Sequence, residues 1–409
     1  MNDMAEQHEK ALVPQIRFTG FTDPWEQRKL GELFEESDER ASDREILSVS
    51  VANGIYPASE SDRETNPGAS LANYKVVHSG DVVYNSMRMW QGAVDASRYD
   101  GIVSPAYVVA KPNSEVYARF FARLLRQPML LKQYQQVSQG NSKDTQVLKF
   151  DDFASIEISM PASENEQRRI GAFFDRLDSL ITLHQRKYDK LCVLKKSMLD
   201  KMFPKGGSLY PEIRFAGFTD PWEQRKLGEL ASKRIEKNTN GIKETFTNSA
   251  EHGVVSQLDY FDHDITNDAN IGNYSVVHPD DFIYNPRISA VAPCGPINRN
   301  KLDRNGVMSP LYTVFSVDDT IDKLYLEHYF KTSRWHQFMF LEGNSGARSD
   351  RFSISDSIFF EMPIQCPVLE EQELIASFFG RLDSLITLHQ RKLELLRNIK
   401  KSMLDKMFV

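Results

Sequence analysis

The chain has 409 residues, of which 41% are apolar and 26% are charged, and its net charge is -7. These values exclude a largely disordered chain and leave room for two folded domains. They also argue against a protein that binds nucleic acid by charge alone, because such proteins carry a basic excess or a basic face. Between residues 168 and 205, however, ten Lys and Arg stand against four Asp and Glu, which allows local contacts with DNA.

No run of eighteen apolar residues occurs, and the first ten residues lack the apolar segment of a signal peptide. We therefore expect a cytoplasmic protein with no membrane association. Cys192, Cys294 and Cys366 are far apart in the sequence. This spacing favours buried free thiols over a disulfide framework or a zinc site.

Three segments occur twice in the chain. Residues 20–33 return letter for letter at 217–230, residues 176–187 at 381–392, and residues 195–203 at 400–408. Between these segments the two halves differ at most positions. The pattern indicates a common frame that carries two different binding domains.

Each half opens with a predicted short helix. Thr and Asp before Pro24 and Pro221 are typical of a helix start, so we expect helices that continue to Leu33 and Leu230. The tryptophans of these repeated segments are interpreted as core or docking anchors: Trp25 and Trp222.

Short runs of β-branched and aromatic residues predict strands in the middle of each half. We expect strands at 74–77, 81–85 and 106–110, and again at 274–277, 281–285 and 311–315. Helical stretches at 115–139 and 321–340 follow, and Gly-Asn-Ser loops come next at 140–142 and 343–345. The order predicts a mixed α/β (α+β) globular domain in each half.

Each half ends in a long predicted helix with one narrow apolar seam. The seam advances by alternating steps of three and four residues, as in a coiled coil. About 40 residues at 1.5 Å each form a rod of roughly 60 Å. Two such rods can pack antiparallel about a pseudo-two-fold axis and hold two DNA-reading domains at a fixed separation. The seam residues are Phe174, Leu177, Ile181, His184, Tyr188, Leu191, Lys195, Met198 and Met202, and Phe379, Leu382, Ile386, His389, Leu393, Leu396, Lys400, Met403 and Met407.

This organisation predicts six segments. They are an N-terminal tail (1–12), a first globular domain (13–162), a first long helix (163–205), a linker (206–210), a second globular domain (211–367) and a second long helix (368–409).

Four motifs give the chain a resemblance to a known family. They are Gly80-Asp-Val-Val-Tyr-Asn85, Trp90-Gln-Gly92, Asp100-Gly-Ile-Val-Ser-Pro-Ala-Tyr107, and Glu166-Gln167 leading into Phe173-Phe174. Together with the repeated frame, from residue 13 to 408, they are similar to the DNA-specificity (S) subunit of type I restriction-modification systems. The second half departs from this pattern, with Asp281-Phe-Ile-Tyr-Asn-Pro-Arg287 and no Trp-Gln-Gly. The departure implies a different half-site.

The resemblance implies two target-recognition domains, each binding one half of a bipartite double-stranded DNA target, and helices that set the spacer. It implies a non-catalytic subunit that binds two methyltransferase (M) subunits and, in the full complex, two restriction/translocase (R) subunits. The sequence contains no phosphate loop, dinucleotide fingerprint, zinc-protease motif, nucleophile elbow or Asn/Asp-Pro-Pro-Tyr/Phe tetrapeptide. S-adenosylmethionine, ATP and Mg are therefore expected on partner subunits and not on this chain.

Loops that differ between the halves are the expected DNA-reading segments. Arg, Asn, Gln, Ser and Thr side chains read base edges, whereas Lys and Arg hold phosphates. An ordinary turn or surface role is a comparable alternative for each, above all for the Asn that both halves share at 85 and 285. The candidates are Asn85, Arg88, Gln91, Asn141, Ser142, Lys143, Thr145 and Gln146, and Asn285, Arg287, Asn344, Ser345, Arg348 and Arg351.

The M subunits are expected to bind surfaces that the two halves share, because two copies of one partner need two equivalent surfaces. The candidates on the long helices, for which a solvated helix face is the alternative, are Gln185, Arg186, Lys187, Gln390, Arg391 and Lys392. Two other classes of protein remain open from the residues alone. One is an adaptor whose domains bind proteins, and the other is an unrecognised nuclease.

Overall fold

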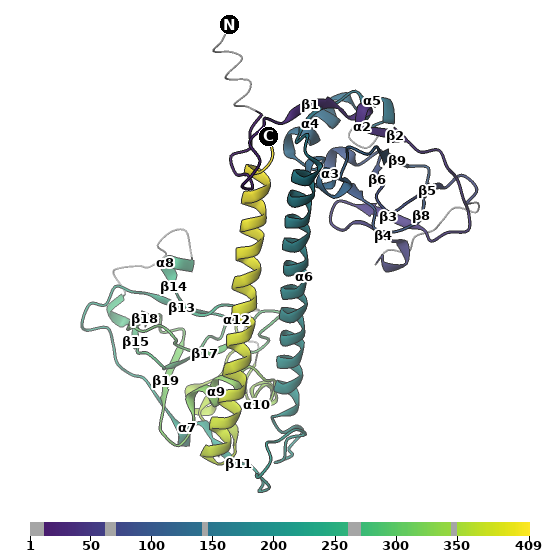
Figure 1. The fold of residues 1–409 in the computed structure, drawn as a ribbon. Helices are drawn as coiled ribbons and strands as arrows, with labels where there is room; N and C mark the ends of the chain where they lie inside the picture. Colours follow the sequence, from purple (N-terminus) through teal and green to yellow (C-terminus); the bar gives the residue numbers. More distant parts are fainter. Residues whose placement is uncertain (1–11, 62–70, 141–145, 261–270, 345–349) are drawn as a thin grey trace. The chain divides into compact units, whose positions relative to one another are not determined.

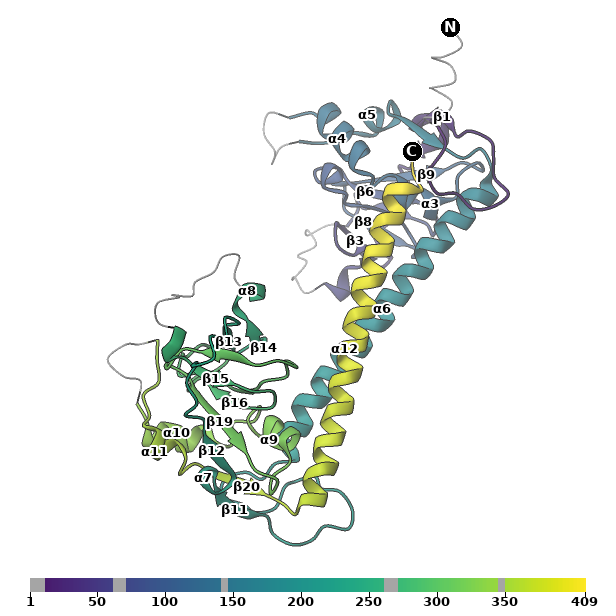
Figure 2. The same cartoon turned by 90° about the vertical axis from the view of Figure 1, so that its left-hand side faces the viewer.

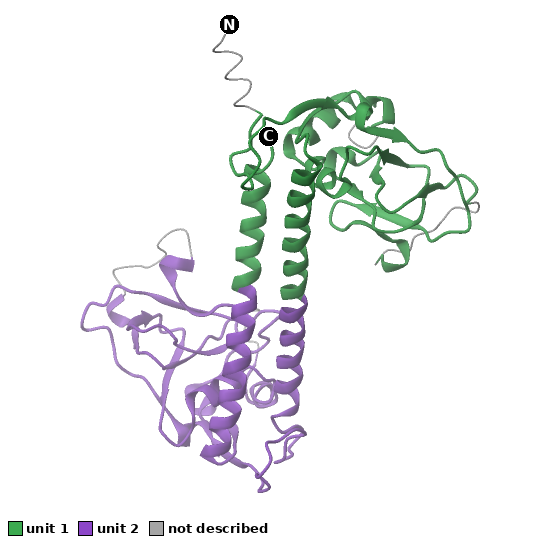
Figure 3. Ribbon diagram, viewed as in Figure 1, with its two compact units in different colours: residues 1–185, 391–409 green, residues 186–390 purple. Residues whose placement is uncertain are grey.

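The computed structural model describes residues 12–61, 71–140, 146–260, 271–344 and 350–409. Its contacts divide the chain into two compact units (Figure 3): unit 1 contains residues 1–185 and 391–409, and unit 2 contains residues 186–390. Both boundaries fall inside the long helices. Each unit therefore contains one globular domain and a part of both helices.

Unit 1 is a series of short strands and small helices that leads into a long helix (Figure 1). Its elements are β1 (Glu26–Lys29), α2 (Leu30–Leu33), β2 (Phe34–Glu36), β3 (Leu47–Ser50), β4 (Gly54–Pro57), η1 (Ala58–Glu60), β5 (Lys75–Val77), β6 (Val82–Asn85), η2 (Met89–Gln91), β7 (Val94–Ala96), β8 (Gly101–Val103), β9 (Tyr107–Pro112), α3 (Ala118–Leu124), α4 (Pro128–Val137), α5 (Phe150–Ala154), β10 (Glu157–Met160) and the first part of α6 (Glu164–Lys201).

Unit 2 repeats this order, and Figure 2 shows its strands beside its small helices. Its elements after the end of α6 are β11 (Glu223–Lys226), α7 (Leu227–Leu230), β12 (Ala231–Lys233), β13 (Phe246–Ser249), β14 (Gly253–Ser256), α8 (Gln257–Tyr260), η3 (Ile271–Asn273), β15 (Ser275–Val277), β16 (Phe282–Tyr284), β17 (Ile297–Arg299), β18 (Gly306–Met308), β19 (Thr313–Val317), α9 (Lys323–Tyr329), α10 (His336–Glu342), α11 (Asp356–Phe359), β20 (Pro363–Cys366) and the first part of α12 (Leu369–Lys406).

The strand order is the same in both units. The four-stranded sheet has the order β2-β9-β6-β7 in unit 1 and β12-β19-β16-β17 in unit 2. Each unit adds three two-stranded ladders, β1-β10, β3-β4 and β5-β8 in unit 1 and β11-β20, β13-β14 and β15-β18 in unit 2. All of these pairs are antiparallel. The repeat in sequence is therefore a repeat of topology, although the two globular domains differ at most positions.

The six predicted strands are confirmed with shifts of one or two residues, as β5, β6, β9, β15, β16 and β19. The predicted helical stretches are confirmed as well, but each is divided into two helices. In unit 1 the second helix begins at Pro128, whose ring is tolerated only in the first turn of a helix.

The short helix expected after Pro24 and Pro221 is wrong for most of its length. Glu26–Lys29 forms β1, which pairs with Glu157–Met160, and only the single turn α2 reaches Leu33. In unit 2, β11 and α7 repeat this arrangement. The segment Glu-Gln-Arg-Lys lacks the apolar alternation that signals a strand, and its partner lies far along the chain. Backbone pairing with that distant partner determines its structure.

The core of unit 1 closes around the C-terminal end of α12. The ring of Phe408 lies 6.2 Å from Trp25, 5.4 Å from Phe120 and 5.9 Å from Phe174, measured between centroids. Trp25 is 1% exposed, so it is a core residue and not a surface docking anchor. Unit 1 thus needs residues from both ends of the chain for one aromatic cluster, which contributes stability through its buried area.

The core of unit 2 closes in the same way around the end of α6. Phe203 lies 6.1 Å from Trp222, 5.6 Å from Tyr325 and 6.1 Å from Phe379. The identical segments 195–203 and 400–408 therefore enter equivalent aromatic clusters. This shared requirement explains why the end of each long helix is repeated without change.

Within each unit the two long helices run antiparallel. In unit 1, Asp178 of α6 pairs with Lys400 of α12 at 2.5 Å, and Gln185 accepts a hydrogen bond from Arg397 at 3.0 Å. Residue numbers therefore increase along α6 while the numbers of the paired residues in α12 decrease. In unit 2, Lys195 and Asp383 form the repeated ion pair at 2.5 Å with the helices exchanged. Among the described residues no helix has an apolar stretch long enough to cross a membrane.

A buried ion pair ties the N-terminal segment of each unit to the start of a long helix. Arg17 donates from Nε and Nη2 to the two carboxylate oxygens of Glu166, at 2.6 and 2.7 Å. Arg214 and Glu371 repeat this two-point contact, with both distances 2.8 Å. The carboxylate partners are 1% and 0% exposed, and their hydrogen bonds raise the pKa of each arginine. A paired fork of this kind fixes direction as well as distance.

The Gln after each of these glutamates holds the loop before the small helices. Gln167 accepts a hydrogen bond from the Tyr117 N–H at 2.8 Å and donates to the Glu115 carbonyl at 3.0 Å. Gln372 accepts from the Asp322 N–H at 2.9 Å and donates to the Pro367 carbonyl at 2.9 Å. The Glu-Gln motif is therefore a structural joint between globular domain and helix.

We expect Glu166→Gln to destabilise unit 1 by about 3 kcal/mol, because it leaves the partly buried Arg17 guanidinium without its anion. The matched control is Glu164→Gln, since Glu164 is exposed and, among the described residues, forms its ion pair with Arg168 on the helix surface. Its expected cost is below about 1 kcal/mol. Urea unfolding of the full chain, followed by circular dichroism, measures both. Equal losses in the two variants would contradict the assigned role.

Candidate nucleic-acid interface

Six of the fourteen candidate DNA-reading residues lie outside the residues that the structure describes. They are Asn141, Ser142, Lys143, Thr145, Ser345 and Arg348. The other eight are placed, and they come from two segments in each unit. One segment follows the central strand β6 or β16, and the other lies after α4 or α10.

In unit 1 the loop after β6 presents two of the candidates to solvent. Arg88 and Gln91 are exposed, whereas Asn85 is half-buried and its Oδ1 accepts a hydrogen bond from the Met87 N–H at 3.0 Å. The turn ends at Gly92, whose φ of 90° favours glycine. The Trp-Gln-Gly motif thus shapes a compact turn that presents its central Gln.

The second segment of unit 1 lies against this loop. The Leu148 N–H donates to the Ser86 carbonyl at 2.9 Å, and residues Gln139 and Val147 pair through two backbone hydrogen bonds of 3.0 and 2.9 Å. These bonds bring Gln146 next to the loop that contains Arg88 and Gln91. The side-chain oxygen of Gln146 is buried and accepts no hydrogen bond from a described residue.

Unit 2 brings its two segments together with the same backbone contact. The Phe352 N–H donates to the Pro286 carbonyl at 2.7 Å, which repeats the bond between Leu148 and Ser86. Asn344 and Ser353 pair in turn through bonds of 3.0 and 2.7 Å. Two loops that are distant in sequence therefore form one surface in each unit.

This contact sets Arg287 directly opposite Arg351 in an antiparallel bridge. Residues opposite each other in such a bridge point to the same face, and like charges in this position repel. Arg287 is exposed, and within the described residues the buried Nε of Arg351 has no hydrogen-bond partner. The pair is a concentration of positive charge that an anion would relieve.

Asn285 has a different environment from the two arginines. It is 8% exposed, its Oδ1 accepts from the Arg287 N–H at 3.0 Å, and its Nδ2 donates to the Asn248 carbonyl at 2.7 Å. Its polar atoms are thus used to hold the loop. This geometry favours the structural alternative for the Asn at this position.

One residue that sequence reasoning missed positions the unit 1 loop. The Arg126 guanidinium donates to the carbonyls of Gly92, at 3.1 Å, and of Val51, at 3.0 Å. Burial lowers its pKa. Arg126 thereby ties the end of the turn that contains Gln91 to the β3–β4 hairpin. A single Arg inside a predicted helical stretch, 115–139, carries no signal for this role.

The partner-binding candidates lie on the long helices, five of them on exposed positions: Arg186, Lys187, Gln390, Arg391 and Lys392. Gln185 is half-buried and accepts a hydrogen bond from Arg397. It therefore takes part in the pairing of the helices within unit 1.

The described residues contain no group of three or more His, Cys, Asp or Glu side chains that could hold a metal ion. The thiols of Cys294 and Cys366 are buried, and burial raises the pKa of each to about 12. A thiol with such a pKa is a poor nucleophile at neutral pH.

A match to a family model identifies the proteins that share this arrangement. The model for the type I restriction modification DNA specificity domain matches residues 22–192 and 219–398, once in each repeat. This chain belongs to that family. The two matches coincide with the two copies of the strand order described above.

Known members of the family resemble the chain over most of its length. A putative type I restriction enzyme MjaX specificity subunit of Methanocaldococcus jannaschii is 21% identical over 362 residues, which cover 82% of this chain and 79% of that protein. The crystal structure of a type I restriction-modification S subunit from M. genitalium has a TM-score of 0.58 at 12% identity, covering 97% of this chain and 99% of that one. The HsdS subunit from Thermoanaerobacter tengcongensis matches at 18% identity with a TM-score of 0.45, over 94% and 96% of the two chains.

We expect Asn285→Ala to lower the stability of the protein and Arg287→Ala to lower its affinity for DNA. Asn285→Ala leaves buried backbone groups without partners and should cost about 1–3 kcal/mol of stability. Arg287→Ala removes an exposed side chain, so stability should stay within about 0.5 kcal/mol while DNA affinity falls. Urea unfolding and fluorescence anisotropy with a duplex containing the target measure the two properties. Full DNA affinity in Arg287→Ala would remove Arg287 from the interface.

Proposed function

We propose that this chain is the DNA-specificity subunit of a type I restriction-modification complex. Each unit binds one half of a bipartite target on double-stranded DNA, and the long helices set the spacer between the halves. The family consists of specificity subunits, which are not themselves catalytic. Methyl transfer and ATP-dependent cleavage would then belong to partner subunits.

The observation that carries the proposal is the pairing of Arg287 with Arg351. Two guanidinium groups on one face cost stability in a protein that binds nothing there. A duplex supplies phosphates and the acceptor atoms of guanine, both of which bind Arg strongly. A protein partner of an adaptor would have to carry acidic side chains at this place to neutralise the pair.

The equivalent surface of unit 1 has different chemistry. It presents Arg88 and Gln91 on its first loop, and the half-buried Gln146, whose Oε1 is buried, lies on the second. Gln pairs well with adenine, whereas Arg pairs well with guanine. The same backbone frame with different side chains would therefore read two different half-sites.

The partners follow from the repeated frame. Two M subunits would bind the two equivalent surfaces of α6 and α12, at the exposed residues Arg186, Lys187, Arg391 and Lys392 and their neighbours. Two R subunits would join the full complex. S-adenosylmethionine on the M subunits and ATP with Mg on the R subunits would supply the chemistry, in the cytoplasm where the target DNA is found.

We expect deletion of this chain to remove one bipartite N6-methyladenine motif from the genome of a host that expresses the cognate M subunit. Methylome sequencing with and without the chain measures this and gives both half-sites. Arg287→Ala is the variant for comparison with the deletion. It should weaken methylation of the motif because it weakens the contact of unit 2 with its half-site and leaves the contact of unit 1 unchanged. A methylome that does not change on deletion would favour the adaptor, and metal-dependent cleavage by the purified chain would favour the nuclease.

A second experiment tests the spacer. Four residues inserted into α6, with the same four at the repeated position of α12, lengthen the paired helices by roughly 6 Å. This length corresponds to about two base pairs at 3.4 Å each. We expect methylome sequencing of the variant to show the same half-sites with a longer spacer. An unchanged spacer with full methylation would refute the role of the helices as a ruler.

A further inference from the structure

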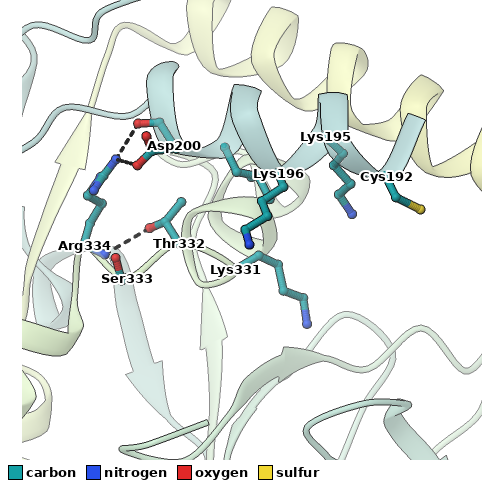
Figure 4. Close-up of a pocket in the computed structure, with 9 residues that line it drawn as sticks. Cys192, Lys195, Lys196, Asp200, Lys331, Thr332, Ser333 and Arg334 are labelled. Atoms are coloured by element: carbon teal, nitrogen blue, oxygen red, sulfur yellow. Dashed lines mark hydrogen bonds and ion pairs between the residues drawn. The ribbon is translucent and has the colours of Figure 1, made fainter. Parts of the chain in front are cut away.

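A pocket in unit 2 lies between the end of α6 and the turn that joins α9 to α10 (Figure 4). Its volume is about 470 Å³. The lining residues are Cys192, Lys195, Lys196, Leu199 and Asp200 of α6, and Lys331, Thr332, Ser333 and Arg334 of the turn. Four of these nine side chains are basic and one is acidic, so the pocket carries an excess of positive charge.

The charges of the pocket are unequally neutralised. Lys195 pairs with Asp383 at 2.5 Å, and the Nη2 of Arg334 pairs with Asp200 at 3.1 Å. Lys196 is exposed and has no hydrogen bond or ion pair with a described residue. The Nε of Arg334 is buried and also lacks a partner among the described residues. Figure 4 shows the side chains of Lys195 and Lys196 extending from α6 toward the turn, whereas the ammonium of Lys331 donates to the Oδ1 of Asn298, which does not line this pocket.

The turn adds hydroxyl groups to these cations. Thr332 is buried, and its Oγ1 donates to the Tyr329 carbonyl at 2.6 Å and accepts from the Arg334 N–H at 3.2 Å. These bonds fix the turn. Ser333 is exposed at the rim of the pocket, and its hydroxyl has no hydrogen bond with a described residue. Ammonium and hydroxyl donors around one small space are the groups that hold a phosphate.

Unit 1 has the same backbone turn without these donors. The Lys331 N–H donates to the His328 carbonyl at 3.0 Å, and the Arg126 N–H donates to the Arg123 carbonyl at 3.3 Å. The next residues in unit 1 are Gln127, Pro128 and Met129. Residues 195–203 of the helix opposite are identical to residues 400–408, with Lys401 in the place of Lys196; of the α6 residues that line the pocket, Cys192 alone differs and is replaced by Arg397 in unit 1. The globular domain of unit 2 therefore creates the pocket on a frame that both units share.

The pocket lies within reach of the DNA that unit 2 would bind. Arg334 stands just before α10, and Asn344 stands just after its end at Glu342. A helix of seven residues is about 10 Å long. Three base pairs of duplex cover the same length at roughly 3.4 Å each. The separation of the two ends of α10 therefore matches about three base pairs of a duplex.

We infer that this pocket binds a phosphate group of the DNA backbone beside the half-site of unit 2. The inference rests on the proposed function and adds a contact that reads no base. A backbone phosphate accepts hydrogen bonds from Lys196, from the Ser333 hydroxyl and from the free Nε of Arg334. The contact positions the duplex on unit 2, while the arginines of the loops read the sequence.

The test compares Lys196→Gln with Lys401→Gln, the same substitution at the repeated position, in the full chain with its M subunits. Loss of one phosphate contact lowers the slope of log affinity against log salt concentration by about one. We expect this change in Lys196→Gln for target and non-target duplexes alike, and no change in Lys401→Gln. Equal slopes in wild type and Lys196→Gln would overturn the inference.

Alkylation of Cys192 gives a second measurement at the pocket itself. Cys192 is half-buried and lines the pocket, whereas Cys294 and Cys366 are buried elsewhere, so mass spectrometry can follow its rate separately. We expect duplex DNA to slow alkylation of Cys192 in wild type and less so in Lys196→Gln. Protection by inorganic phosphate without protection by duplex would assign the pocket to a free anion and overturn the DNA contact.

Two further outcomes separate this inference from the proposed function. Suppose that the wild type binds DNA, that DNA does not slow alkylation of Cys192, and that Lys196→Gln does not change the salt slope. This result refutes the phosphate contact in the pocket and leaves the proposed function intact. Absence of any DNA binding by wild type refutes both. If the M subunit protects Cys192 and Lys196→Gln weakens assembly instead of DNA binding, the pocket is a protein contact and the inference is wrong.

Discussion

The structure depends on one constraint, which is that each globular core is completed by the end of a long helix. Phe203 fills the aromatic cluster around Trp222 in unit 2, and Phe408 fills the cluster around Trp25 in unit 1. Unit 1 can therefore form only when the last residues of the chain reach a core that begins near its start. Closing so long a loop costs entropy, which the buried aromatic area has to offset. The same constraint explains why residues 195–203 and 400–408 are identical, since a change in either would have to suit an equivalent cluster.

The frame and the globular domains meet at a carboxylate that the repeat keeps constant. Asp178 in unit 1 pairs with Arg123 at 2.6 Å, whereas Asp383 in unit 2 lies 4.0 Å from the Nε2 of His328. Burial and the nearby Lys195 lower the pKa of His328 to about 4, so this His is neutral at pH 7. The helix lysine neutralises this carboxylate in both units, and unit 1 adds Arg123 from its globular domain, where unit 2 has a neutral His. A constant frame can in this way accept globular domains with different side chains.

The sequence predicts what is local or repeated. The duplicated segments reveal the frame, and the runs of β-branched residues locate β5, β6 and β9. The strand Glu26–Lys29 escapes prediction because its residues are charged and its structure depends on a partner more than a hundred residues away. The candidate site shows the same limit. Arg287 is identified by its place in a variable loop, but its position opposite Arg351 follows from a backbone contact between distant segments.

A chain with a net negative charge can bind DNA when its cations are concentrated on the surface that contacts the duplex. Lys195 and Lys400 are held by Asp383 and Asp178 within their units, so the paired helices contribute little free positive charge at these positions. Where the globular domains differ, unit 2 adds the Arg287–Arg351 pair, whose guanidinium groups form no ion pair with a described residue. Non-specific affinity scales with the number of phosphate contacts, so the neutralisation of Lys195 and Lys400 within the units would lower the affinity for random DNA. Discrimination between sequences then depends on the loops, which is the property that a specificity subunit requires.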